Sequence, residues 1–276
     1  MKPPAGMRAF VKGVGFVASG IASWDATREI IAARSRYTAG PLPAMSPDIL
    51  PPAERRRSGV VIRLALTVAQ QALAHAHAAP DELASVFASA WGDSENVHHI
   101  CLALATSQTD LSPTRFHNSV QNAPSGYWSI ATRSHAPSNT VNGLDSVFAT
   151  GLLEAVVQVR AEGRDVLLVC YDVPMPAPLF RLHPLGASCA VAILLGAQPA
   201  DGSLAVVDVA RIPGRTLDVA TMGDPALEGL RNANPAARAL PLLQGIAKGE
   251  ACRLGFDLDP YAMLQVDVNA IARSAR

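Results

Sequence analysis

The chain has 276 residues, of which 49% are hydrophobic and 17% are charged, and its formal net charge is zero. A chain of this length and composition can bury one large core or two modest ones, which excludes extensive disorder. Basic residues are scattered except for the run Arg55-Arg56-Arg57. The basic patch expected of a nucleic-acid-binding protein is therefore missing, and we interpret the run as a solvated face before a helix.

The cysteines and the N-terminal segment indicate a soluble, cytoplasmic protein. No two cysteines form a Cys-x-x-Cys pair, which argues against a zinc site and against a disulfide framework. The four are Cys101, Cys170, Cys189 and Cys252. The N-terminus resembles no signal peptide, and no apolar stretch approaches the roughly 20 residues that a membrane-spanning helix needs. We therefore expect reduced thiols, no membrane span, no bound metal and no cofactor.

The first part of the chain predicts strands and helices in alternation. Residues 8–19 are rich in Val and Phe and alternate in polarity, which predicts a strand. A proline-rich loop at 41–52 precedes a helix predicted over 58–78, where apolar residues recur at helical spacing. A short buried strand is predicted at 83–90 and a further helix at 93–106.

The same alternation continues through the middle of the chain. The predicted elements are a helix at 123–135, a strand at 139–142, a helix at 145–162 that Gly163 ends, and strands at 165–171, 188–195 and 203–209. Beyond residue 211 the pattern weakens, with one or two helices within 226–254 and a last strand at 262–268. Strands alternating with helices over this length predict an α/β fold with a mainly parallel sheet.

Five short segments carry a resemblance to a known family. They are NAPSG at 122–126, APSNTV at 136–141, GLLEA at 151–155, GRDV at 163–166 and LGASCA at 185–190. In this order they resemble the N-terminal half of the β-ketoacyl synthases of the thiolase superfamily. The resemblance implies a thiolase-like layered fold with a mixed sheet, in which residues 8–209 form the synthase-like domain. Residues 210–276 would then be a short C-terminal extension, the remnant of a truncated second half.

One longer segment points to a narrower group. SPTRFHNSVQNAPSGYWSIAT, at 112–132, followed by an aspartate at the next strand-to-helix turn, is similar to the chain length factors encoded with aryl polyene pigment genes. This resemblance implies a heterodimer with a catalytic β-ketoacyl synthase. It also implies that the heterodimer takes part in the elongation of polyene, polyketide or fatty-acid-like chains that are carried on an acyl carrier protein.

The residue at that turn decides what chemistry the resemblance allows. Active synthases have a cysteine there, because the dipole of the following helix favours its thiolate, whereas this chain has Asp145. A carboxylate could take up an acyl group only as an anhydride, which is a poor resting place for an acyl chain. All seven histidines precede residue 184, so the C-terminal region lacks the two histidines that the family uses. We therefore expect no catalytic residue.

Asp145 also has a structural explanation. Aspartate is favoured at the N-cap of a helix, where its side chain accepts a backbone N–H bond worth about 1 kcal/mol. We expect Asp145 to cap the helix predicted at 145–162. The alternative left open is that Asp145 shapes an acyl pocket or an interface.

The helix predicted at 123–135 resembles the dimer-interface helix of synthases. The resemblance implies that Tyr127 and Trp128 face the partner subunit or line its acyl tunnel, with Asn122 and Pro124 beside them. The alternative is that the two aromatic side chains fill the core of this chain, since large aromatic residues are common in both settings.

Three functions remain open on the sequence. The first is a non-catalytic chain length factor that pairs with an active synthase and reaches acyl carrier protein through the complex. The second is a priming or decarboxylating acyltransferase, and the third is a purely structural partner of the synthase. We expect no activity from the chain alone, and we expect it to self-associate when its partner is absent.

Overall fold

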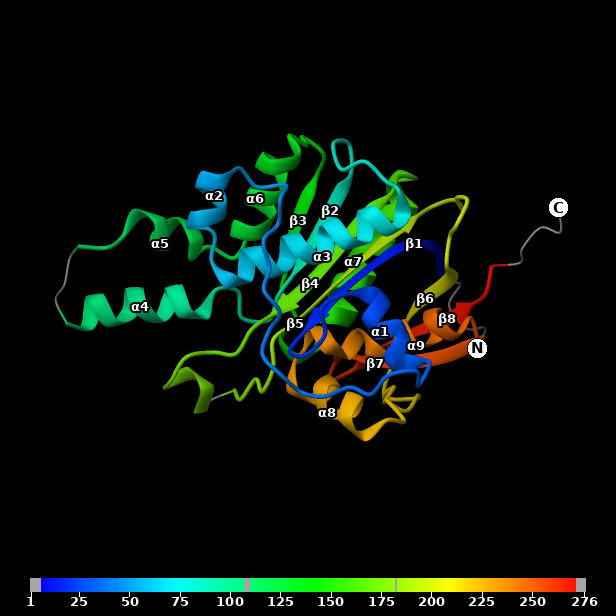
Figure 1. Ribbon diagram of the computed structural model, residues 1–276. Helices are drawn as coiled ribbons and strands as arrows, with labels where there is room; N and C mark the ends of the chain where they lie inside the picture. Colours follow the sequence, from blue (N-terminus) through cyan, green and yellow to red (C-terminus); the bar gives the residue numbers. More distant parts are fainter. Residues whose placement is uncertain (1–5, 107–109, 182, 272–276) are drawn as a thin grey trace.

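The computed structural model describes residues 6–106, 110–181 and 183–271 (Figure 1). Eight strands form one sheet in the order β3-β2-β4-β5-β1-β6-β8-β7. The strands are β1 (Met7–Ala18), β2 (Ala84–Ala88), β3 (Ser138–Val141), β4 (Val166–Asp172), β5 (Cys189–Gly196), β6 (Ala205–Pro213), β7 (Cys252–Asp259) and β8 (Ala262–Asn269).

Nine α-helices and three short 3-10 turns are formed by the described residues. The helices are α1 (Trp24–Ile31), α2 (Pro52–Arg57), α3 (Val60–Ala76), α4 (Ser94–Ala105), α5 (Pro113–Asn118), α6 (Ala123–Thr132), α7 (Val147–Glu162), α8 (Pro225–Ala233) and α9 (Leu240–Lys248). The 3-10 turns are η1 (Leu144–Ser146), η2 (Leu179–Arg181) and η3 (Ala236–Ala239).

The direction of the strands corrects the prediction of a mainly parallel sheet. Only two of the seven pairs of neighbouring strands in the described sheet are parallel, β2 with β3 and β2 with β4. Every other pair of neighbours is antiparallel. The apolar runs of β4 and β5 misled the prediction, because a continuous apolar run reports burial on both faces rather than strand direction. Both strands are buried along their whole length.

Helices cover both faces of the sheet, and successive residues of β4 show the division. Leu168 packs in the layer that contains α7, α8 and α9, whereas Leu167 and Val169 pack in the layer that contains α3 and α6. Figure 1 shows α3 lying across one face of the sheet and α7 behind the other. This layered arrangement confirms the predicted α/β class.

The contact between α3 and β1 depends on two glycines. A Cβ atom at Gly13 would lie 2.2 Å from the carbonyl oxygen of Ala72, and one at Gly15 would lie 2.1 Å from that of Val68. Both distances are too short for a carbon atom, so the helix can lie directly on the strand backbone only because these positions lack a side chain.

Side chains of α3 also bond the backbone of β1 where its pairing with β6 has ended at Val11. The N–H of Phe16 donates to Gln71 Oε1 at 3.0 Å, and the N–H of Val14 donates to His75 Nδ1 at 3.2 Å. Burial lowers the pKa of His75, which keeps the ring neutral and able to accept this bond.

The predicted elements after residue 210 were incomplete. The sequence predicted helices up to residue 254, but residues Cys252–Asp259 form β7, which pairs with β8 as a hairpin. The short helices α1, α2 and α5 were also missed. The predicted division at residue 209 stays a prediction, although β6 runs across it and β7 and β8 extend the same sheet. Among the described helices, none has the length and apolar character needed to cross a membrane.

Candidate functional site

The turn between β3 and α7 carries the residue at the predicted nucleophile position. The backbone of Leu144 has a φ of 48°, a left-handed conformation that is costly for a branched side chain. Its N–H is held by Asn142 Oδ1 at 3.1 Å, and Asn142 Nδ2 donates to the carbonyl oxygen of Ala90 at 2.7 Å. This turn, which we call the elbow (residues 142–146), is therefore fixed to the loop that follows β2.

The predicted capping role of Asp145 is wrong. Asp145 lies inside η1, and α7 begins after Ser146, whose side chain makes no capping bond. The Asp145 carboxylate lies instead 3.8 Å from His183 Nε2 and 3.8 Å from a terminal nitrogen of Arg238. The side chain of Asp145 is 56% exposed. Two basic side chains from distant parts of the chain thus face this carboxylate.

His183 was missed by sequence reasoning, which had assigned it no place at the elbow. Its ring packs against Trp91 with centroids 4.9 Å apart. The backbone N–H of Trp91 in turn donates to the buried carboxylate of Asp172 at 3.0 Å. No local pattern in the sequence marks these contacts, because they join the loop after β2, the end of β4 and the segment around η2.

Asp172 ties the end of β4 to the loop after β2. Its carboxylate accepts bonds from Ser89 Oγ and from the N–H groups of Ala90 and Trp91, at 2.9 to 3.1 Å. Burial raises the pKa of Asp172 to about 7, against the opposing effect of these bonds. The side-chain amide of Asn234 donates to the Asp172 carbonyl at 2.9 Å, so both the side chain and the backbone of Asp172 are hydrogen-bonded at this junction.

The space behind the elbow is too small for an acyl chain. A cavity of about 10 Å³ is lined there by Asp145, Phe148, Arg238 and Phe256, among others. The rings of Phe148 and Phe256 fill the region in an edge-to-face contact with centroids 5.5 Å apart. A cavity of this size holds at most about one water molecule. An acyl chain that reached Asp145 would have to approach from outside this cavity.

The cysteines offer no alternative nucleophile at the elbow. Cys170 and Cys189 are fully buried in the sheet, and burial raises the pKa of both thiols well above the ordinary range. Burial also raises the pKa of Cys252, on β7. Cys101 is exposed, but it lies on α4. A neutral, buried thiol is not a nucleophile, because the thiolate is the reactive form.

The α6 residues predicted to face a partner divide into two groups. Asn122 is exposed, whereas Tyr127 is buried in the same layer as Trp128, at 6% exposed, with its hydroxyl donating to Asn118 Oδ1 at 3.1 Å. Pro124 and Trp128 are buried, and Trp128, at 1% exposed, packs in the layer between α3 and the sheet. The position of Trp128 favours the core-filling alternative for that residue. A role of these residues at an acyl tunnel stays a prediction.

A large hollow borders the outer side of α6. It has a volume of about 860 Å³, which is within the range of small-molecule sites. Ile49, Leu50 and Ala131 give it an apolar lining, and Tyr127 and Ile130 form part of its wall. Arg57, Arg133, His117 and Glu54 also line it. Among the residues predicted for the site, Tyr127 is the one that lines this hollow.

Exposed apolar side chains occur on α6 and on α4 and α5, and the latter two helices project away from the sheet in Figure 1. We call these side chains together the arm surface; it comprises Val97, Leu102, Leu104, Phe116, Val120 and Ile130, each between 41% and 71% exposed. Along α4 itself only Ser94 and Asn96 are buried. The sequence contained the signal, since Phe116 lies in the segment that resembles chain length factors, but exposure cannot be read from the sequence.

No group of three or more His, Cys, Asp or Glu side chains among the described residues is arranged to hold a metal ion. The charged contacts at the elbow come instead from one carboxylate, one guanidinium and one imidazole. The contacts described at the elbow are therefore contacts between protein side chains.

Comparison with known families supports the resemblance read from the sequence. The model of the β-ketoacyl synthase N-terminal domain matches residues 29–224, which is more than half of the chain. The matched region contains the elbow, α6 and the whole of the projecting arm. A comparison with curated proteins finds no match.

Solved structures of ketosynthase assemblies share the fold. A chain of the complex of the ketosynthase ApeO with its chain length factor ApeC from Xenorhabdus doucetiae aligns with a TM-score of 0.70 at 21% identity, covering 95% of this chain and 98% of that one. The ishigamide ketosynthase/chain length factor aligns with a TM-score of 0.71 at 15% identity, covering 96% and 99%.

A third structure is the AntDE–AntF complex, described as a type II polyketide synthase acyl-carrier protein with its ketosynthase bound to the hexaketide. It aligns with a TM-score of 0.74 at 11% identity, covering 96% of this chain and 100% of that one. At these identities the likenesses establish a shared thiolase-like fold, which confirms the predicted fold family.

Proposed function

The chain belongs to the β-ketoacyl synthase family, and we propose that within this family it is a non-catalytic subunit of the chain length factor type that pairs with a catalytic synthase. The observation that carries the proposal is the combination of an elbow without a thiol and an apolar arm surface beside it. The first feature argues against chemistry in this chain, and the second argues for a partner.

The elbow supports a non-catalytic role on chemical grounds. Acyl transfer between thioesters needs a nucleophile that is also a good leaving group, and the carboxylate of Asp145 is not one. Arg238 and His183 each approach the Asp145 carboxylate to 3.8 Å, so this side chain faces two basic groups. The cavity of about 10 Å³ behind it leaves no room for a bound acyl chain.

The arm surface supports pairing. Apolar side chains that gather on an exposed surface can mark an interaction site. The most exposed members of the arm surface, Ile130 at 71%, Leu104 at 64% and Phe116 at 63%, come from three consecutive helices. An interface of obligate partners is apolar and commonly buries more than about 2,000 Å². A catalytic synthase of the same fold is the partner we propose.

A role in setting chain length would act through α6. Tyr127 lines the 860 Å³ hollow, and Asn122 is exposed at the start of the same helix. The related structures include a ketosynthase with its chain length factor and an acyl-carrier protein with its ketosynthase. We propose that acyl carrier protein reaches the complex through the catalytic subunit and that α6 bounds the space available to the growing chain.

Co-expression with catalytic β-ketoacyl synthases tests the pairing. We expect a heterodimer on size-exclusion chromatography and self-association or aggregation of the chain alone. Products of the purified complex should then be compared by mass spectrometry with those of the same complex carrying Tyr127→Phe or Tyr127→Ala. A stable monomer that ignores every synthase offered contradicts the pairing, and an unchanged product profile leaves only a structural partner.

A second candidate is a priming or decarboxylating acyltransferase, which the approach of His183 to Asp145 favours. Incubation of the chain with acyl carrier protein thioesters, followed by intact-protein mass spectrometry, separates it from the first. A stable acyl adduct on Asp145, or decarboxylation that His183→Ala abolishes, would establish the enzyme. We expect neither.

A further inference from the structure

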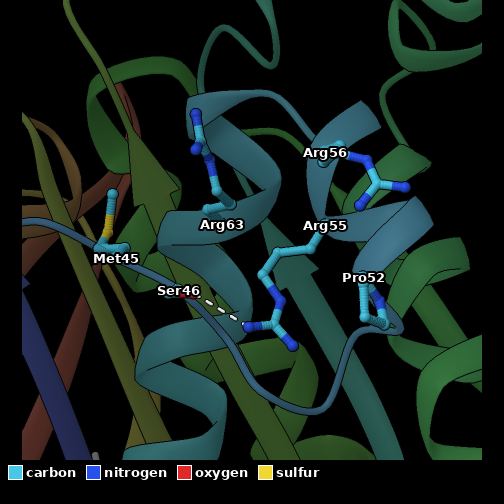
Figure 2. Close-up of a pocket in the computed structure, with 6 residues that line it drawn as sticks. All are labelled: Met45, Ser46, Pro52, Arg55, Arg56 and Arg63. Atoms are coloured by element: carbon cyan, nitrogen blue, oxygen red, sulfur yellow. Dashed lines mark hydrogen bonds between the residues drawn. The ribbon is translucent and has the colours of Figure 1, made fainter.

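The run Arg55-Arg56-Arg57 on α2 is divided by the fold into groups with different surroundings. Arg57 turns to Glu54, with a terminal nitrogen 3.5 Å from the carboxylate. Arg55 folds back along the chain, donating to Ser46 Oγ at 3.1 Å and to the carbonyl oxygen of Leu50 at 3.0 Å (Figure 2). The run is thus not a uniform solvated face.

A further arginine, Arg63 from the first turns of α3, joins Arg55 and Arg56 around one pocket. Figure 2 shows that Arg55 and Arg56 come from α2 and Arg63 from α3, with their guanidinium groups pointing in different directions. The pocket has a volume of about 380 Å³, and its lining is completed by Met45, Ser46 and Pro52. No carboxylate lines it. Three cations therefore share one concave surface without an anion on its wall.

The arginines around this pocket form no close ion pair within the described part of the chain. Arg55, Arg56 and Arg63 form no ion pair there, although many other surface arginines do, including Arg8, Arg34 and Arg253. The nearby carboxylate of Asp48 accepts a bond from Gln70 at 2.6 Å; this bond, together with the charge of Arg55, lowers the pKa of Asp48. Positive side chains that line one pocket without an acidic residue make its electrostatic potential positive, which favours a bound anion.

Two of these side chains also have a hydrogen-bond donor without an acceptor in the described part of the chain. The Nε atoms of Arg55 and Arg63 are buried and have no acceptor among the described residues. A guanidinium presents several donors in a planar fork that matches the oxygens of a phosphate group. A rotation of either side chain toward an anion in the pocket would give these donors acceptors.

We propose that this pocket binds a small organic phosphate. A phosphate ester carries close to two negative charges at neutral pH and several acceptor oxygens, which suits three guanidinium groups. The volume exceeds that of a phosphate group alone, and Met45 and Pro52 supply an apolar wall for an organic part. The proposal does not depend on the proposed pairing function, because the pocket lies within one chain.

Isothermal titration calorimetry on the full chain tests the proposal with three probes: inorganic phosphate, phenyl phosphate and benzoate. Phenyl phosphate should bind most tightly, because it combines the dianion with a ring that can contact Met45 and Pro52. Inorganic phosphate should bind more weakly and benzoate weakest. Equal binding of benzoate and phenyl phosphate would overturn the assignment to phosphate, and no saturable binding of any probe would overturn the site.

Two substitutions locate the binding. Arg56→Gln changes an exposed side chain and should leave folding intact, while Arg63→Lys keeps the charge but removes the fork. Each should weaken phenyl phosphate by about tenfold or more, corresponding to the loss of one charge-assisted bond. The control is Arg164→Gln, which removes an arginine paired with Glu162 at 2.8 Å after α7. Unchanged binding in both pocket variants, or equal weakening in the control, would overturn the proposal.

Discussion

Replacing Phe116 by alanine should weaken pairing with the catalytic synthase without unfolding the chain. Phe116 lies on α5 and is 63% exposed. Complete burial of a phenylalanine side chain is worth about 1.5–3 kcal/mol. Covering the exposed part in an interface is therefore worth about 1–2 kcal/mol, which corresponds to a dissociation constant about 5- to 30-fold higher in the variant.

The folding stability of the same variant should change little. Truncation of an exposed side chain usually alters the free energy of unfolding by about 0.5 kcal/mol or less, and alanine is a good helix former at this position. The matched control is Tyr261→Ala. Tyr261 is 81% exposed in the turn between β7 and β8, and in Figure 1 these strands lie at the other end of the sheet from α5.

The assay is a titration of the purified synthase with each variant, followed by analytical ultracentrifugation or surface plasmon resonance, with urea denaturation of each variant alone. We expect weaker association for Phe116→Ala, wild-type association for Tyr261→Ala, and similar denaturation midpoints for both. The reasoning is refuted if Phe116→Ala binds as tightly as the wild type, because the arm surface would then not face the partner.

Three further predictions follow from the fold and the elbow. Trp128→Ala should lower the free energy of unfolding by about 3–5 kcal/mol in urea denaturation, because it empties a buried site; a loss below about 1 kcal/mol would contradict its core position. Asp145→Cys should not create a condensing enzyme in assays with acyl carrier protein thioesters, because the cavity behind the elbow is only about 10 Å³; turnover would contradict a non-catalytic elbow. Compared with His75→Gln, the wild type should lose free energy of unfolding as the pH drops below about 6.5, because its unfolded chain then binds a proton that burial denies to His75 in the folded state; the comparison, made by urea titrations at several pH values, cancels the opposite contribution of Asp172, whose pKa burial raises to about 7.

Local patterns predicted the helices and strands that bury long apolar runs. The helix α3 and the buried strands β4 and β5 were predicted correctly because each has its own run of apolar residues, which indicates burial. Strand direction was not, because it depends on the route of the connecting segments. The turn between β7 and β8 is only two residues long, and its antiparallel pairing followed from a hairpin that the sequence reasoning had assigned partly to helix.

The elbow shows a similar limit at the level of single residues. The position of Asp145 in the strand–turn–helix unit was predicted, since it depends on neighbours in the sequence. Its partners were not, because His183 and Arg238 arrive through separate segments of the fold. The capping prediction failed for a local reason: the chain makes one extra 3-10 turn before α7, which places Asp145 too early to serve as the cap.

The central place of β1 has a consequence for the order in which the chain is made. β1 precedes the other strands of the described sheet in the chain, yet its two neighbours in the sheet, β5 and β6, begin only at Cys189 and Ala205. During synthesis it would wait unpaired through most of translation, a state in which strand edges aggregate. α3 is complete much earlier, and its Gln71 and His75 bond the N–H groups of Phe16 and Val14. In the nascent chain, α3 can therefore pack on β1 and bond its N–H groups before β5 and β6 have been synthesised.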